Sequence, residues 1–302
     1  MQEFNKLIKE IGEELNIKVT LLSDNWLTIL EKDSNIKYIQ GYKFSLNDHG
    51  LGNIVDDKGL FYDLMIYKNL PIIEHFVIFK DYDKKIILDY FNNHNKEIIV
   101  KGNIGTCGKE VFKINDEQSL FSKIDELFKS QFSISLCPYY NIVNEYRVIV
   151  LNHEPRLVYG KTRPIVIGDG ISTLKELAYA FNESYYSNEK HLNKLSDYIP
   201  KKDEQVTLNF QFNLSNGAKL FLDIDKELKE KLIELALSVS KQTNLIFGSI
   251  DIILTSDNKL MIMEANSGVM MNNLMNLIPN GREIAKSIYS DAIKLMFQEG
   301  VK

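Results

Sequence analysis

The 302-residue sequence predicts an α+β (mixed α/β) fold, because helix-like and strand-like segments both recur along the chain. The first and last segments carry apolar residues at helical spacing, whereas the middle is rich in β-branched and aromatic runs with period two. Hydrophobic residues make up 44% and charged residues 25% of the chain, as in an average globular protein. A chain of this length has room for two or three compact units.

The N-terminal segment is expected to form a helix followed by a short strand at 18–22. Residues 31–60 mix polar and turn-forming residues, so we expect mainly irregular structure there. The apolar face of the helix is formed by Phe4, Leu7, Ile8, Ile11 and Leu15.

Two helices are predicted next, over 60–70 and 83–95. The first ends before Pro71, because the residue that precedes a proline disfavours the helical conformation. Strands at 98–101 and 111–114 then enclose a turn-rich loop. An apolar stripe marks the following helix: Leu120, Ile124, Leu127 and Phe128.

From residue 132 onward, strand-like runs dominate. Thr173 and Glu176 have the spacing of a capping box and open a helix, and residues 182–204 are interpreted as a polar insertion. Apolar stripes predict helices around 228–239 and 284–295. The strands are predicted at 132–136, 145–151, 156–161, 205–212, 249–254 and 260–264.

Composition excludes several classes of protein. The chain has 36 basic and 41 acidic side chains, a net charge of −5, so we expect no nucleic-acid or anionic-membrane partner. Cys107 and Cys137 are too few for a disulfide framework or a four-thiolate zinc site, and the five histidines show no metal-binding spacing. No signal peptide and no run of 18 uncharged apolar residues is present, so we expect a cytoplasmic protein.

The sharpest motif is a carboxylate inside an apolar strand, followed by a second strand that ends in Glu-x-Asn. If the two strands pair, the oxygens of Asp251, Glu264 and Asn266 converge. A carboxylate in an apolar strand requires a cation or strong donors, and such oxygen ligands suit Mg²⁺. The spacing leaves open a second interpretation, in which both carboxylates pair with lysines at a sheet edge.

A lysine and a glycine-rich loop form the second motif. Lys101 ends one strand, and Gly102, Gly105 and Gly108 would let backbone amides approach a phosphate closely. The loop is not a Walker A motif, because Glu110 stands where Ser or Thr is required. An ordinary glycine-rich hairpin remains the alternative.

In this order, the motifs resemble those of the ATP-grasp superfamily. The resemblance runs from about residue 57 to the C-terminus and implies a fold of two α+β lobes that clasp ATP. It divides the chain into an N-terminal α/β segment (1–56), a small lobe with the phosphate loop (57–135), and a large lobe with the magnesium and substrate sites (136–302). Further stretches around 145–150, 161–164, 168–174 and 213–217 are similar to cyanophycin synthetase, glutathione-synthesising ligases and ribosomal-protein glutamate ligases.

The resemblance also implies roles for particular residues. Lys58 and Lys101 would contact the phosphates of ATP under the glycine loop, and the backbone around Cys137 and Tyr139 would hold adenine. Magnesium, with Mn²⁺ as a substitute, would be held by Asp251, Glu264 and Asn266. The sequence departs from the family at Gly102, where proline is usual, and after Asn266, where the common ending differs.

The implied reaction joins a small carboxylate or amino acid, or a short peptide, to an amine through an acyl phosphate. Arg147 lies on the inward face of its strand and requires an anion there, either the reacting group or a structural partner such as Glu145 or Glu264. Lys161 and Arg163 either clamp the substrate or are solvated loop cations. The alternatives are an ATP-grasp kinase and a non-catalytic ATP-binding partner protein, and the family leaves a homodimer open.

Overall fold

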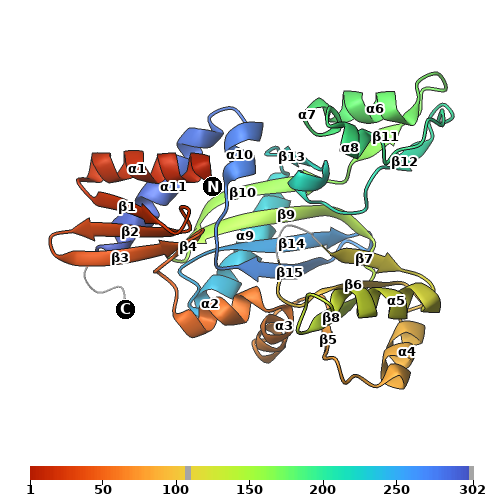
Figure 1. Ribbon diagram of the computed structural model, residues 1–302, viewed down its shortest axis with the longest axis horizontal. Coiled ribbons are helices and arrows are strands. Elements are labelled where there is room, and N and C mark those ends of the chain that lie inside the picture. The colour runs from red at the N-terminus through yellow and green to blue at the C-terminus, as the bar shows by residue number, and fades with distance from the viewer. Residues whose placement is uncertain (106–109, 299–302) are drawn as a thin grey trace.

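The structure is a computed structural model that describes residues 1–105 and 110–298. It contains a central antiparallel sheet, with a smaller sheet at each end and a helical insertion above one of them (Figure 1). None of the described helices combines the length and the apolar character needed to cross a lipid bilayer.

The N-terminal unit is a helix on a four-stranded sheet, which the sequence predicted only in part. The expected irregular region from residue 31 instead contains a hairpin and a helix, so that prediction was wrong. The hairpin turns at Asp33 and Ser34, which both have positive φ. Apolar side chains lie on both faces of its second strand, where Ile36 and Tyr38 are about half exposed and Ile39 is buried, and this hides the period-two pattern. The elements are α1 (Gln2–Leu15), β1 (Lys18–Leu22), β2 (Leu27–Lys32), β3 (Asn35–Gln40), β4 (Lys43–Phe44) and α2 (His49–Asp56).

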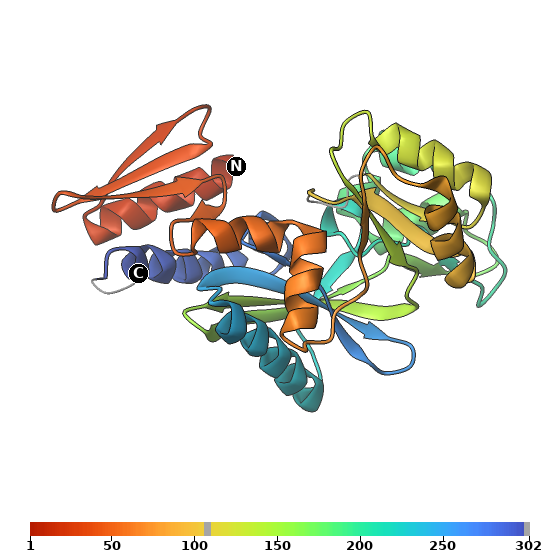
Figure 2. The ribbon, with the colours of Figure 1, turned by 90° about the horizontal axis from the view of Figure 1, so that it is seen from below.

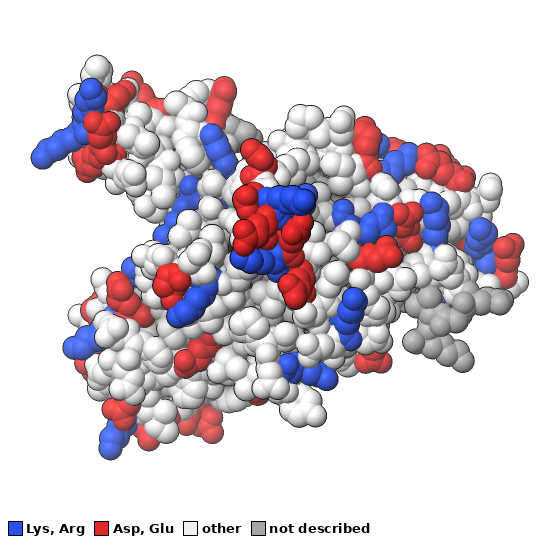
Figure 3. Space-filling view, turned by 180° about the vertical axis from the view of Figure 1, so that it is seen from behind, with Lys and Arg blue, Asp and Glu red and all other residues white. Residues whose placement is uncertain are grey.

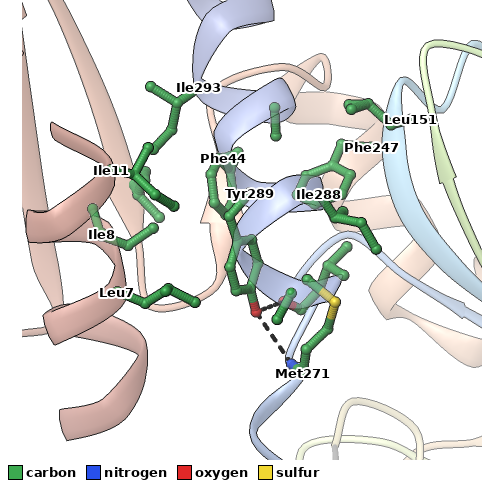
Figure 4. Close-up of a cluster of buried hydrophobic side chains, with 14 of the residues drawn as sticks. Leu7, Ile8, Ile11, Phe44, Leu151, Phe247, Met271, Ile288, Tyr289 and Ile293 are labelled. Carbon is green, nitrogen blue, oxygen red and sulfur yellow. Dashed lines mark hydrogen bonds between the residues drawn. The ribbon is translucent and has the colours of Figure 1, made fainter. Parts of the chain in front are cut away.

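The C-terminal helix α11 (Gly281–Met296) joins this unit to the central sheet. In Figure 4, Ile8 of α1 faces Tyr289 of α11, and Phe247 of the central sheet lies on the other side of the helix. The hydroxyl of Tyr289 donates to the carbonyl of Val269 at 2.8 Å and accepts from the amide of Met271 at 3.2 Å. One continuous core therefore links the two ends of the described chain.

The central sheet has the order β13-β10-β9-β14-β15, and all its neighbouring strands are antiparallel. The amphipathic helix α9 (Lys226–Thr243) covers one face, burying Leu232, Ala236 and Val239. The short helix α3 (Lys58–Tyr67) packs near β15, beside α2 (Figure 2). The strands are β9 (Ile142–Leu151), β10 (Glu154–Thr162), β13 (Lys219–Phe221), β14 (Phe247–Thr255) and β15 (Leu260–Asn266).

The smaller sheet at the other end has the order β5-β8-β6-β7 and is covered on one face by two helices (Figure 2). The predicted strands and helices are confirmed here to within a few residues. The elements are β5 (Phe76–Ile78), α4 (Lys84–Asn93), β6 (Ile98–Gly102), β7 (Val111–Ile114), α5 (Glu117–Leu127) and β8 (Ile134–Pro138).

The interpreted insertion at 182–204 contains two short helices followed by irregular structure, and the capping box that precedes it is confirmed between Thr173 and Glu176. The predicted strand at 205–212 is confirmed only for its first three residues. On the rear face, acidic and basic side chains of the described residues are intermixed (Figure 3). The remaining elements are β11 (Ile165–Ile167), α6 (Leu174–Phe181), α7 (Glu183–Tyr186), α8 (Glu189–Leu192), β12 (Gln205–Thr207), the 3₁₀ turn Leu214–Asn216 and α10 (Asn272–Leu277).

Candidate active site

A cavity of about 1000 Å³ opens on the face of the central sheet opposite α9. The N-terminal sheet, the smaller sheet and the turn after β15 also contribute to its lining. Gly108 and Cys107 lie outside the described residues. The other sequence-predicted site residues all line this cavity: Lys58, Lys101, Gly102, Gly105, Cys137, Tyr139, Arg147, Lys161, Arg163, Asp251, Glu264 and Asn266.

The start of the glycine loop is tied to the N-terminus of α3 through Asn103, which is 3% exposed. The side-chain nitrogen Nδ2 of Asn103 donates to Asp57 Oδ2 at 2.8 Å, and the side-chain oxygen Oδ1 accepts from the backbone amide of Gly59 at 3.0 Å. Lys58 Nζ donates to the carbonyls of Asn103 and Gly105 at 3.2 and 3.3 Å. The Asp-Lys pair and the glycine loop, 45 residues apart, thus form one structural unit.

Two buried amines face the cavity beside this loop. Lys58 and Lys101 are each 8% exposed. Burial lowers the pKa of Lys58, and the charge of Lys101 lowers it further, whereas Glu264 opposes the shift. The paired positive charges create a local preference for an anion, although the chain as a whole is acidic.

A buried network of four charges lies on the neighbouring strands β9, β10 and β14. Asp251, which is 1% exposed, accepts from Arg147 Nε at 2.8 Å and from Arg147 Nη2 at 2.5 Å. Lys161 Nζ donates to Asp251 Oδ1 at 3.3 Å and also to Glu145. The sequence predicted an anionic partner for Arg147 but named Glu145 or Glu264, and the structure shows Asp251 instead.

The network fixes the charge of its members. Burial raises the pKa of Asp251, but Arg147 and Lys161 outweigh it and hold the pKa at about 2. Burial likewise works against the charge of Lys161, yet Asp251 and Glu145 raise its pKa above the ordinary value. Arg147, Lys161 and Asp251 are therefore all ionised at neutral pH.

The three predicted metal ligands lie on paired strands, as the sequence indicated. Asp251 is opposite Glu264 and Ser249 is opposite Asn266, with an irregular register next to Asp251. Such bulges re-aim side chains and are common beside active sites. Among the described residues, no donor contacts the carboxylate of Glu264, and the buried Nδ2 of Asn266 has no partner.

This donor set fits a magnesium ion held in part by its substrate. Asp251 Oδ1 already accepts from two donors, whereas Oδ2 accepts from one and keeps a lone pair. Glu264 supplies a carboxylate and Asn266 an amide oxygen. The described residues contain no group of three His, Cys, Asp or Glu side chains placed to hold a metal alone. Magnesium is commonly bound by one or two carboxylates completed by phosphates and water.

The end of the cavity toward the smaller sheet is apolar. Ile73, Cys137 and Ile253 form a buried cluster with partly buried neighbours such as Met263. The amide of Tyr139 donates to the carbonyl of Glu97 at 3.0 Å, and the Lys113 amine lies 3.5 Å from the centre of the Tyr139 ring. A flat apolar group can therefore be enclosed here beside backbone groups.

Cys137 is expected to resist alkylation in the folded protein. Burial raises the pKa of its thiol to about 11, so that about one thiol in a thousand is ionised at pH 8. Iodoacetamide at pH 8 should modify the tryptic peptide ending at Arg147 roughly a hundredfold more slowly than the same peptide from urea-unfolded protein. Equal rates in the two samples, measured by mass spectrometry, would contradict the burial of this thiol.

Arg163 lies over the ring of Phe212, with its guanidinium carbon 4.8 Å from the ring centre. Its buried Nε has no hydrogen-bond partner among the described residues. Arg163 is therefore a positioned side chain at the cavity wall rather than a solvated loop cation. Asn213 and Ser215, which follow on the same segment, also line the cavity.

Sequence reasoning missed the part of the cavity wall that comes from the N-terminal sheet. Trp26, Gln40, Tyr42 and Lys43 line the cavity but precede the recognised motifs. Tyr159, opposite Arg147 in register, was also missed. The one signal in the sequence for this wall is Trp26, the single tryptophan of the chain, which follows the polar turn residues Ser-Asp-Asn.

Comparisons with known proteins agree with the expected fold. The chain is 21% identical to the glutathione biosynthesis bifunctional protein GshAB of Mannheimia succiniciproducens, an alignment that covers 89% of this chain and 39% of the relative. The structure matches a bifunctional glutathione synthetase from Pasteurella multocida (TM-score 0.54, 17% identity, 95% of this chain and 44% of the other). It also matches a D-alanine–D-alanine ligase from Bacillus anthracis (TM-score 0.54, 14% identity, 80% and 66%). No model of a known protein family matches the sequence.

The chain therefore has the ATP-grasp fold that its motifs predicted. It spans about two-fifths of the length of the two bifunctional relatives.

Proposed function

We propose that the chain is an ATP- and Mg²⁺-dependent ligase that joins a small carboxylate, amino acid or short peptide to an amine. The observation that carries this proposal is that one cavity combines three kinds of surface: an apolar end, two buried amines, and a network of carboxylates and cations. The fold is shared with enzymes named as glutathione synthetase and D-alanine–D-alanine ligase, which supports the same reaction class.

ATP would occupy the end of the cavity toward the smaller sheet. Adenine would lie in the apolar cluster around Cys137, next to the backbone of Tyr139. The phosphates would then lie beside Lys58 and Lys101, under the loop that Asn103 anchors. Because both amines are desolvated, each interacts with a phosphate more strongly than an exposed lysine does.

Glu264, Asn266 and the remaining lone pair of Asp251 would hold magnesium. Bound there, the ion would neutralise negative charge on the phosphate oxygens during transfer. The pairing of Asp251 with Arg147 and Lys161 keeps that carboxylate ionised and fixed in place.

The reaction would proceed in two displacements. A carboxylate oxygen of the first substrate attacks the γ-phosphorus, the bond to the β-phosphate oxygen breaks, and ADP leaves. The neutral amine then attacks the acyl carbon, the carbon–oxygen bond to phosphate breaks, and the amide, inorganic phosphate and a proton are released. Of the five N–H donors of Arg147, two point to Asp251, which leaves three for the acyl phosphate.

The test is incubation of the protein with ATP, Mg²⁺ and defined pairs of amino acids, followed by mass spectrometry. We expect ADP, phosphate and an amide product in equal amounts. A phosphorylated product that persists without amide formation would instead establish the kinase alternative. ATP binding without turnover for every pair would favour the non-catalytic partner protein.

A further inference from the structure

Trp26 presents an open aromatic surface to the cavity. It is the only tryptophan in the chain, and it is 58% exposed although it lines the cavity wall. Its indole lies against Gly41, where an added Cβ would be only 2.8 Å from indole Cζ3. Gly41 also has φ of +59°, and its amide donates to the carbonyl of Trp26 at 2.7 Å. The indole is thus supported by backbone on one side and left open on the side of the cavity.

The N-terminal sheet is held in a fixed position next to the candidate magnesium site. The carbonyl of Tyr42 accepts from the amide of Val269 at 3.1 Å. Lys43 forms an ion pair with Asp56, whose two carboxylate oxygens accept from the amide and the hydroxyl of Ser267, each at 3.0 Å. Ser267 directly follows the Glu-x-Asn motif, so the wall that carries Trp26 is tied to the reactive centre.

This wall belongs to the part of the molecule opposite the expected nucleotide end. The N-terminal sheet and the smaller sheet lie at opposite ends of the central sheet (Figure 1). The apolar cluster around Cys137 belongs to the smaller-sheet end, whereas Trp26 lies in the turn between β1 and β2 of the N-terminal sheet. A ligand that touches Trp26 is therefore the second occupant of the cavity rather than adenine.

The chemistry of this wall is aromatic and apolar with a few polar groups. Met270 and Leu214 line the cavity together with Tyr42, and Leu214 packs against the same core as Tyr42. Asn272 donates to the hydroxyl of Tyr42 at 3.0 Å, and its Oδ1 has no hydrogen-bond partner among the described residues. Lys43 is neutralised by its ion pair with Asp56, so it is not available to bind an acidic side chain of a substrate.

We propose that Trp26 is a specificity-determining residue, and that the substrate bound against it is an amino acid or short peptide with an apolar or aromatic side chain. The proposal rests on the ligase function proposed above and adds the class of the substrate. The substrate side chain covers the open face of the indole, and its backbone carboxylate or amine faces the charged network. An acidic side chain finds no partner at this wall.

The fluorescence of Trp26 reports on this end of the cavity directly, because the full sequence contains no other tryptophan. With ADP and Mg²⁺ present, titration with L-phenylalanine, L-leucine and their D-isomers should give a saturable blue shift for at least one of them. Nucleotide alone should leave the emission maximum unchanged. L-glutamate, as the charged comparison, should give no shift at the same concentrations.

Variants test the same proposal through kinetics. Trp26→Ala should raise KM for an apolar amino acid at least tenfold and leave KM for ATP unchanged, and Trp26→Phe should restore most of the difference. Trp26 is largely exposed, so its replacement spares the buried core. Tyr67→Ala is the matched control, because Tyr67 is 77% exposed on α3 and does not line the cavity.

The outcomes separate this proposal from the ligase function. A blue shift without phosphate release would retain the binding assignment and reject the ligase reaction. Phosphate release whose amino-acid KM is the same in wild type and Trp26→Ala would overturn the role of Trp26 and keep the ligase. No spectral change with any of these probes would overturn the assignment, whatever the activity.

Discussion

Arg147→Met is expected to lower the free energy of unfolding by about 3 kcal/mol, because it removes the main partner of a buried carboxylate. Asp251 is 1% exposed, and two of its three hydrogen bonds come from Arg147. Only the weaker contact with Lys161, at 3.3 Å, would remain. Urea unfolding followed by circular dichroism measures the loss.

The pH dependence identifies Asp251 as the source of this loss. In the native protein the pKa of Asp251 is lowered to about 2 from its ordinary value of 3.8. A lowered pKa stabilises the fold above the ordinary value, and this stabilisation disappears as the pH falls from about 4 to about 2. The variant should therefore differ most from wild type near neutral pH and approach it below pH 4.

Two comparisons test this interpretation. Arg282→Met removes a surface pair with Glu10, in which both side chains are about 40% exposed, and should cost less than about 1 kcal/mol. Arg147→Met combined with Asp251→Asn should recover most of the stability, since no unpaired charge stays buried. A loss for Arg147→Met as small as that for Arg282→Met would contradict the account.

Glu264→Gln is expected to lower kcat about a thousandfold while the protein stays folded. Among the described residues, Glu264 is the carboxylate of the candidate magnesium site with no hydrogen bond to give up, so the change removes charge and little structure. Loss of the metal's charge stabilisation costs several kcal/mol in the transition state. Phosphate release at varied Mg²⁺ and Mn²⁺ measures both kcat and the apparent metal affinity.

The matched control is Glu283→Gln, in the first turn of α11 and outside the cavity lining. It should leave kcat and the magnesium dependence as in wild type. If Glu264→Gln behaved like this control, the carboxylate would have no part in metal binding.

The sequence was sufficient where the arrangement of residues depends on local spacing. Asp251, Glu264 and Asn266 were expected to converge because only a short turn separates the two apolar strands that carry them. The two strands do pair. Lys101 was correctly placed near the end of a strand, because a short β-branched run is a local feature.

Long-range register was beyond the sequence. The partner of Arg147 is 104 positions away, and nothing local distinguishes Asp251 from Glu145 as that partner. The hairpin of β2 and β3 was missed because β3 carries apolar side chains on both faces, so Trp26 was not assigned to a cavity formed mostly by later residues.

The packing of α1 against α11 also has a consequence for biosynthesis. Glu10 and Arg282, whose side chains pair across these helices, are separated by 272 positions. During translation, the apolar face of α1 leaves the ribosome long before its partner helix, because the two helices are so far apart in the sequence. Until then, the nascent N-terminal unit exposes the side chains of Leu7, Ile8 and Ile11, a surface suited to capture by chaperones, and its final docking is a late step of folding.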